Sequence, residues 1–253
     1  MKQNRITTAE ITNVSPTCGK PTVMGSTGIK ESFSVRSINN FECKDWILHK
    51  HYAKRLPPIE YAFGLFSNEN ILQGVVTYAT PVSSNLRGIF NNEFKLMELN
   101  RLCVNEGLKK NCLSFFVSQS LKLLPVPLVI ISYADTSQNH HGYIYQATNF
   151  IYTGLSAKRT DWKVKGLEHL HGATIADMSR GKENRAEYMR QKYGEDFYLE
   201  DRARKHRYFM FLGNKKEVNQ MKLLLPYRIE SYPKGDNERY DAGYKPTVQM
   251  PLF

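Results

Sequence analysis

The segment from residue 128 to residue 154, LVIISYADTSQNHHGYIYQATNFIYTG, constrains the fold most, because a polar loop separates two apolar runs. The aliphatic residues 128–131 are typical of a buried strand, and this pattern stops at Asp135. Apolar residues then recur at helical spacing in 143–147, and a second β-rich run covers 150–153. The segment predicts a strand, a polar loop, a short helix and a second strand.

Asp135 occupies a position with two interpretations. An acid at the carboxyl end of a buried strand, above the N-terminus of a helix, stands where α/β folds place ligands. The same acid could equally cap the next helix, since Asp is a favoured N-cap residue. The spacing alone leaves both interpretations open.

The composition bounds the class of protein. The chain has 253 residues, of which 41% are hydrophobic, enough for one large domain or two small ones. No apolar run approaches the roughly 20 residues of a membrane span, and the polar N-terminus has no signal-peptide core. The four cysteines, at positions 18, 43, 103 and 112, show no metal-type spacing and are expected as free thiols. A protein of the cytoplasm is expected, with no membrane partner.

The net charge of +11 is unevenly distributed along the chain. Residues 157–216 contain 15 Lys and Arg against 9 Asp and Glu, and residues 1–60 contain 9 against 5. Residues 61–156 are close to neutral, with 6 basic and 5 acidic residues. A neutral centre between basic segments favours a polyanion-binding protein, because contacts to phosphates supply most non-specific affinity for DNA. Many basic proteins do not bind DNA, so charge alone leaves the partner open.

Periodicity and breakers predict the remaining elements. Residues 1–33 are rich in Thr, Ser, Gly and Pro and predict an extended arm. The expected helices are one that follows the caps Asn39-Asn40 and reaches His49 or Tyr52, and others at 113–124, in a charged run within 177–193, and at 214–225. The expected strands cover 61–66, 71–78, 94–104, a short region within 159–172, and 205–213, with a loop at 80–92.

Polar residues interrupt apolar strands at Arg101, Ser132 and Asp135, which are therefore candidate catalytic residues. An Arg at the active edge of a sheet can hold a carboxylate or phosphate, and a nearby Asp can orient it or act as a base. A purely structural Arg–Asp pair is the alternative. Alternation in the strand 94–104 predicts two faces, Leu96, Glu98 and Asn100 on one and Met97, Leu99 and Arg101 on the other.

A metal site is a second hypothesis from the residues. His51, Tyr52 and Asp135 would offer an imidazole, a phenol and a carboxylate, a donor set that suits iron. The chain contains no Gly-x-Ser-x-Gly, no Walker loop and no Gly-x-Gly-x-x-Gly. Hydrolase and P-loop functions therefore have little support.

The order of elements resembles the GNAT acyltransferase fold. Ile144-Tyr145-Gln146-Ala147-Thr148-Asn149-Phe150 is similar to the end of the GNAT helix that carries a catalytic tyrosine, with Asn149 in place of Gly. The resemblance implies an α/β fold with a mixed, mostly antiparallel central sheet flanked by helices, here with a basic C-terminal insert. The loop from Gly107 to Cys112 lacks the expected glycine pair, although Lys109 and Lys110 could meet phosphates. The donor is left open between acetyl-CoA and another acyl or glycyl carrier.

A closer resemblance is to the Mom proteins of Mu-like phages, over roughly residues 35–240. It is carried by the motifs His51-Tyr52-x-Lys54-Arg55, Glu98-Leu99-Asn100-Arg101-Leu102, Ser132-Tyr133-Ala134-Asp135, Gly142-x-Ile144-Tyr145-Gln146-Ala147-Thr148-Asn149 and Lys205-His206-Arg207-Tyr208. The resemblance implies addition of a carbamoylmethyl group to the exocyclic amine of adenine, which protects phage DNA from host restriction. It also implies an association with iron and a site lined by His51, Tyr52, Arg101, Ser114, Asp135 and Tyr145.

Such an enzyme would act on double-stranded DNA in the cytoplasm of the bacterial host, with adenine flipped into a pocket. Residues 34–253 are expected to form one catalytic domain, in which the basic insert 157–207 grips the backbone. A homodimer is left open, as are two other functions, an acetyl-CoA-dependent N-acetyltransferase and a DNA-binding protein without catalysis. The expected DNA-binding residues are Lys54, Arg55, Arg159, Arg180, Arg185, Lys205 and Arg207.

Overall fold

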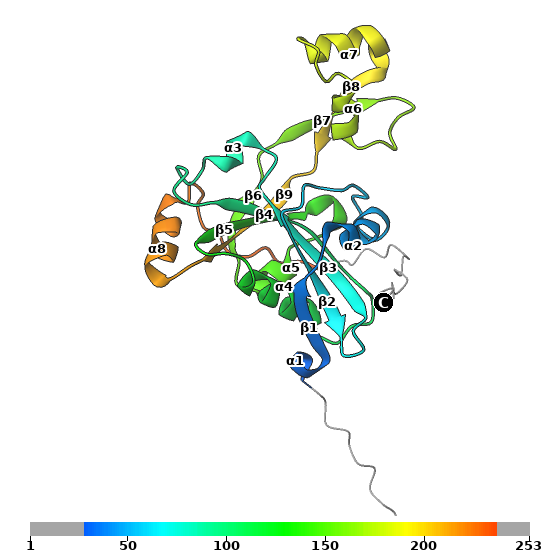
Figure 1. The fold of residues 1–253 in the computed structure, drawn as a ribbon. Coiled ribbons are helices and arrows are strands. Elements are labelled where there is room, and N and C mark those ends of the chain that lie inside the picture. Colours follow the sequence, from blue (N-terminus) through cyan, green and yellow to red (C-terminus); the bar gives the residue numbers. More distant parts are fainter. Residues whose placement is uncertain (1–27, 237–253) are drawn as a thin grey trace, which may run out of the picture.

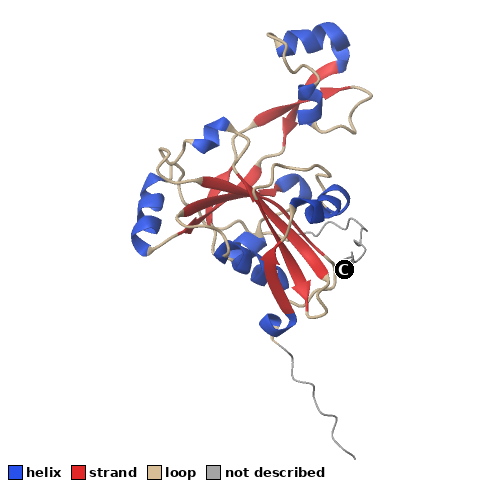
Figure 2. Cartoon of the chain, viewed as in Figure 1, coloured by secondary structure: helices blue, strands red, loops and turns tan. Residues whose placement is uncertain are grey.

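A seven-stranded sheet forms the centre of the molecule in the computed structural model, which describes residues 28–236 (Figures 1 and 2). The strand order is β1-β2-β3-β4-β5-β9-β6, and of the neighbouring pairs only β4 and β5 run parallel. The predicted mixed, mostly antiparallel sheet is thereby confirmed. The strands of this sheet are β1 (Phe33–Ser37), β2 (Tyr61–Ser67), β3 (Leu72–Ala79), β4 (Leu96–Val104), β5 (Leu128–Asp135), β6 (Ile151–Leu155) and β9 (Lys205–Leu212).

Helices cover both faces of this sheet (Figure 1). Phe116 of α4 and Tyr145 of α5 pack into the cluster on one face, and Met221 of α8 packs into the cluster on the other. Between residues 28 and 236, no helix is long and apolar enough to cross a membrane. The α-helices are α1 (Ile29–Ser32), α2 (Asn40–Asp45), α3 (Ser84–Arg87), α4 (Cys112–Lys122), α5 (Tyr143–Ala147), α6 (Gly172–Asp177), α7 (Arg185–Tyr193) and α8 (Lys215–Leu224).

The run of aliphatic residues in β5 is explained by these two layers. Ile130 belongs to the cluster beneath α4 and α5, whereas Val129 and Ile131 belong to the cluster beneath α8. A strand covered on both faces needs apolar side chains at successive positions rather than alternating ones. The predicted strand, polar loop, short helix and strand of residues 128–154 are confirmed.

Four short elements were not predicted. The strand β1 at the sheet edge and the helices α3 and α6 have only four to six residues, too few for a clear period. The strand β8 (Phe197–Arg202) carries charges and is formed by pairing with β7 (Arg159–Val164). Residues 1–27 of the predicted arm lie outside the described residues, and residues 29–32 form the one-turn helix α1 instead of an extended chain.

The helix α2 begins with a capping box and continues into an irregular turn. The Asn39 side chain accepts a hydrogen bond from the backbone N–H of Glu42, and the Glu42 carboxylate accepts one from the N–H of Asn39. The helix then widens into a π-helical turn, Trp46–Lys50, in which the N–H of His51 bonds to the carbonyl of Trp46 at 3.1 Å. π-turns are frequent at functional sites, and this one delivers His51 and the following Tyr52 to the sheet edge.

A bulge in β4 corrects the predicted strand faces. Leu99 pairs with Tyr78 and Arg101 pairs with Thr77, so Asn100 is an additional residue on β4. Consecutive residues of β3 point to opposite faces, and directly paired residues point to the same face. Arg101 therefore lies on the face opposite Leu99, which is the face of Glu98, and its predicted grouping with Met97 and Leu99 was wrong.

The basic insert forms a small unit of its own that projects from the main sheet (Figure 1). The strands β7 and β8 pair as a two-stranded sheet, and α6 and α7 pack on it around Val164, Ile175 and Met189. At its base, the Arg204 guanidinium donates to the carbonyls of Leu155 and Ser156 at 3.2 and 2.6 Å. These bonds tie the return of the chain into β9 to the end of β6.

Ile130→Ala tests the two-layered core. Ile130 is fully buried between the helical layers, so the substitution should lower the free energy of unfolding by about 2–5 kcal/mol. Leu223→Ala on α8 is the control, because Leu223 is 86% exposed and its loss should change stability by less than about 0.5 kcal/mol. Equilibrium urea unfolding measures both, and equal effects would contradict the assignment of β5 to the core.

Candidate active site

A cavity of about 780 Å³ opens where β4 and β5 part. Their parallel pairing ends at Leu99 and Ser132, although both strands continue. A volume of this size is typical of a ligand pocket. The base of the insert contributes Ser156, Ala157 and Arg202 to the wall. Of the predicted site and DNA-binding residues, the lining includes His51, Tyr52, Arg101, Ser114, Tyr145, Arg159, Lys205 and Arg207.

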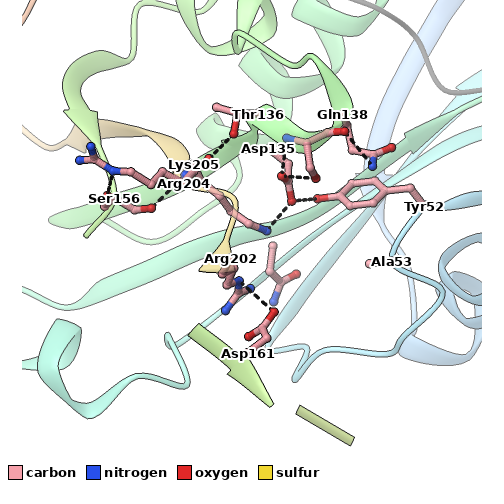
Figure 3. A network of polar contacts seen from close by, with 12 residues as sticks. Tyr52, Ala53, Asp135, Thr136, Gln138, Ser156, Asp161, Arg202, Arg204 and Lys205 are labelled. Atoms are coloured by element: carbon pink, nitrogen blue, oxygen red, sulfur yellow. Dashed lines mark hydrogen bonds and ion pairs between the residues drawn. The ribbon is translucent and has the colours of Figure 1, made fainter. Parts of the chain in front are cut away.

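Asp135 lies behind this lining, at the end of β5, and is the centre of a polar network (Figure 3). Its Oδ2 atom is 2.8 Å from the Lys205 ammonium and 3.4 Å from the Tyr52 hydroxyl. Its Oδ1 atom accepts bonds from the backbone N–H and the hydroxyl of Ser137 at 3.1 and 2.7 Å. Asp135 therefore caps the 3₁₀ turn Thr136–Gln138 and also fixes two residues that line the cavity.

These contacts set the ionisation of Asp135. Burial alone would raise the pKa of its carboxyl, but the hydrogen bonds from Lys205 and Ser137 outweigh burial and hold that pKa below its ordinary value. Both oxygens are occupied by donors. The arrangement therefore favours a permanently ionised carboxylate that positions Lys205 and Tyr52. It does not favour a general base that exchanges protons.

His51 and Tyr52 form one wall of the cavity. Their rings stack with centroids 4.5 Å apart, and His51 accepts a bond at Nδ1 from the backbone N–H of Ala53. Burial, followed by the charges of Arg101 and Lys205, lowers the pKa of His51 to about 3, so its imidazole is neutral. Burial and the neighbouring Asp135 carboxylate raise the pKa of Tyr52, which therefore remains a hydrogen-bond donor.

The predicted iron ligands His51, Tyr52 and Asp135 do come together, but the donor set does not fit a metal. The Lys205 ammonium lies at Asp135 Oδ2, where a bound cation would have to bind, and Ser137 occupies Oδ1. Across residues 28–236, no group of three or more His, Cys, Asp and Glu side chains is placed to hold a metal ion.

Tyr145 lies on the other side of the sheet from Asp135. Its pKa is raised to about 12 by burial, which outweighs a hydrogen bond with the predicted catalytic residue Ser132, so its hydroxyl stays protonated. Ser132 is fully buried and donates to the Leu99 carbonyl at 2.9 Å, so it supports Tyr145 from outside the lining. The Tyr145 ring also packs against the Tyr208 ring, with centroids 5.2 Å apart. Gly142 leaves room for Tyr208, since it has a φ of 75° and a Cβ there would lie 2.5 Å from the Tyr208 ring.

Arg101 is held by carbonyl groups rather than by Asp135. Its guanidinium donates to the Asn100 carbonyl at 2.7 Å and to the Arg55 carbonyl at 2.9 Å. The buried Nε atom has no hydrogen-bond partner within residues 28–236. The alternative of a structural Arg101–Asp135 pair does not occur, because Lys205 is the cation beside Asp135.

Glu98 lines the cavity and was missed as a site residue. Burial raises the pKa of its carboxyl, and the charges of Arg101 and Lys205 oppose that shift only in part. The signal was present in the sequence, since Glu98 is an acid inside an apolar strand. The bulge that places Glu98 and Arg101 on one face was not readable from alternation.

The predicted cofactor-binding lysines lie outside the lining. The Lys109 ammonium donates to the Ser32 hydroxyl at 2.7 Å, and Lys110 is exposed in the turn before α4. At the start of α4, Ser114 lines the cavity, and its hydroxyl donates to the Asn111 carbonyl at 2.9 Å. Lys109 and Lys110 as phosphate contacts stay a prediction.

The predicted DNA-binding residues fall into two groups. Arg159, Lys205 and Arg207 line the cavity, and the Arg207 guanidinium also lies 3.4 Å from the centre of the Tyr227 ring. The others lie outside the lining: Lys54, Arg55 and Arg180, the last two near Asp177, and Arg185, which bonds to Ser179 and to the carbonyl of Ala176.

Comparison with known proteins assigns the family. Residues 32–234 match the model of the Mom protein family. The chain belongs to the Mom family. It is similar to the methylcarbamoylase Mom of Escherichia phage Mu, with 29% identity over 215 residues, which cover 82% of this chain and 86% of that protein. The resemblance inferred from the five motifs is confirmed.

Solved structures similar to this member of the Mom family are GNAT acetyltransferases. One, from Bacillus cereus, has 14% identity and a TM-score of 0.35, and the match covers 72% of this chain and 99% of that one. The spermidine/spermine N-acetyltransferase SpeG of Vibrio cholerae has 10% identity and a TM-score of 0.40, with 78% and 98% covered. Similarity at this level supports no conclusion about fold or substrate.

Asp135→Asn tests the network by its pH dependence. The pKa of Asp135 is lowered on folding, so its stabilising effect is fully present above the ordinary value of 3.8 and is lost as pH falls through the lower folded value. At pH 7 the substitution should cost about 1–3 kcal/mol of unfolding free energy, and the cost should shrink below pH 4. Urea unfolding at both pH values measures it, with the exposed Glu195→Gln as control. A cost that grows on acidification would contradict this role.

Proposed function

We propose that this Mom-family protein is a transferase that adds a carbamoylmethyl group to the exocyclic amine of adenine in DNA and so protects phage DNA from host restriction. The observation that carries the proposal is the family match over residues 32–234, together with the similarity to a protein named methylcarbamoylase. The cavity between β4 and β5 supports it, because an enzyme that modifies a base in a duplex needs a pocket for the flipped nucleotide.

The lining supports binding of a base. Tyr52, Tyr133 and Tyr145 face the cavity, and aromatic rings stack on bases of any sequence. Tyr61, by contrast, packs against the core cluster. The protonated Tyr145 hydroxyl would orient the reacting groups, and Arg101 would hold the carboxyl or amide of the donor.

Asp135 takes a different role in this proposal from the base suggested by the sequence. Its oxygens are already occupied by Lys205, Tyr52 and Ser137, so it acts through these neighbours. Its loss would release the Lys205 ammonium and the Tyr52 hydroxyl from fixed positions. It is therefore a positioning residue.

The charge distribution supports duplex DNA as substrate. The insert 157–207 has 13 Lys and Arg against 9 Asp and Glu, and its base borders the cavity through Arg159 and Arg202. A basic projection beside a base-sized pocket could bind phosphates while a nucleotide enters the pocket. The acetyl-CoA-dependent alternative gains no support from the lysines before α4, which lie outside the lining.

Mass spectrometry of nucleosides tests the reaction. Plasmid DNA from bacteria that express the chain should contain an adenosine heavier by one carbamoylmethyl group, absent with an empty vector. Asp135→Ala should lower its yield by about 100-fold, because misplaced catalytic groups cost this much, while affinity for duplex DNA stays nearly unchanged. Unmodified adenine with the wild-type protein expressed would contradict the proposed function.

Salt dependence of DNA binding tests the insert. Arg180 has a 79% exposed side chain on this projection, so Arg180→Ala should weaken duplex binding at all sequences and reduce the slope of log K against log salt by about 1. Lys122→Ala, at the end of α4 and outside the predicted DNA contacts, is the matched control. Identical slopes for wild type and Arg180→Ala would remove Arg180 from the DNA contacts.

A further inference from the structure

Glu98 is a half-buried acid to which the proposed function above gives no role. It stands on β4 two residues before the bulge, on the same face as Arg101, and it lines the cavity. Its neighbours act on it only through charge, and no hydrogen bond to its carboxyl is found within residues 28–236. Asp135 differs in this respect, because each of its two carboxylate oxygens accepts hydrogen bonds from protein donors.

A ligand that enters the cavity and excludes water from this carboxyl must supply a hydrogen-bond donor in return. Burying a polar group without partners costs free energy, whereas a bond formed with a ligand recovers it. Because Glu98 faces the cavity, its oxygens can be reached by a molecule bound there. The missing partner is therefore a hydrogen-bond donor on that molecule.

The chemistry of the bases identifies this donor. Adenine carries an exocyclic amine, N6, beside the acceptor N1. A carboxyl oxygen accepts from N6, and a neutral carboxyl can also donate its O–H to N1. Thymine presents a carbonyl oxygen in place of the amine and so has no donor at that position. We propose that Glu98 accepts a hydrogen bond from the amino group of the flipped adenine and thereby discriminates against thymine, though not against cytosine, which also carries an exocyclic amine. The inference rests on the proposed function and names a specificity residue for it.

A carboxylate and a neutral carboxyl both accept from N6, so the proposed contact does not depend on the protonation state of Glu98. Burial raises the pKa of the carboxyl, although Arg101 on β4 and Lys205 on β9 oppose the shift. The charge of Glu98 acts on two phenols, Tyr133 on β5 and Tyr145 on α5, which have raised pKa values and carry no charge. A side-chain amide at this position would offer the same acceptor and a donor, so Glu98→Gln is the informative conservative variant.

A cycle of protein and base substitutions tests the contact through binding rather than activity. Two duplexes place either adenine or purine, which lacks the amine, opposite an abasic site, so that the base is already unpaired. Wild type should bind the adenine duplex about tenfold more tightly, the value of one well-made hydrogen bond. Glu98→Ala should bind both duplexes equally, and Glu98→Gln should keep most of the preference. Glu93→Ala, an exposed acid before β4, should behave as wild type.

The outcomes separate this inference from the function on which it rests. Wild-type affinity of Glu98→Ala for the purine duplex shows that this variant is folded. A preference for adenine that survives in Glu98→Ala, or that wild type lacks, overturns the role of Glu98. If the wild-type protein still yields the modified adenosine, the proposed function stands in that case. An absence of modified adenosine removes the proposed function itself, whatever the preference measured in binding.

Discussion

The short parallel contact between β4 and β5 determines the site. Only four residue pairs, from Leu96–Val129 to Leu99–Ser132, join the two strands, although β4 continues to Val104 and β5 to Asp135. Each strand still has an antiparallel neighbour on its outer side, so the sheet remains continuous while its centre opens. Backbone groups freed by this parting need polar partners, since buried unpaired groups are costly. The polar residues that interrupt two apolar strands are therefore at the point where the fold requires them.

The bulge at Asn100 converts this opening into a site with a defined polarity. Without it, Arg101 would point to the face of Leu99 and Glu98 to the opposite one. With it, both charged groups face the same side, and the Thr77 hydroxyl bonds to Asn100 Oδ1 at 2.6 Å. Bulges re-aim side chains next to active sites in many sheets. Here the bulge brings a guanidinium to the wall that Asp135 and Lys205 reach from β5 and β9.

Sequence reasoning predicted the elements with strong periodicity and failed where tertiary pairing decides. The strands β2, β3 and β5 and the amphipathic helix α4 have enough residues to show a period. The strand β8 has charged residues at half its positions and exists because β7 pairs with it. The site residues His51, Tyr52 and Tyr145 could be selected by motif, whereas the bond from Lys205 to Asp135 could not, since the residues are 70 positions apart. The same applies to Glu98, whose importance depends on a register shift that alternation does not reveal.

The two carboxyls of the site illustrate how environment assigns roles to identical groups. Asp135 has donors at both oxygens, and its pKa falls below the ordinary value despite burial. Glu98 is half-buried and receives no hydrogen bond from residues 28–236, and burial raises its pKa although two cations are near. Carboxyls whose pKa values are driven apart in one site usually divide the work between a fixed charge and a group that exchanges or donates a proton. Since both oxygens of Asp135 are hydrogen-bonded by other groups of the protein, Asp135 stabilises the wall of the cavity. Glu98 is the acid whose oxygens can still accept a hydrogen bond from the substrate. Recognition of the base is therefore placed at β4 rather than at the motif around Asp135.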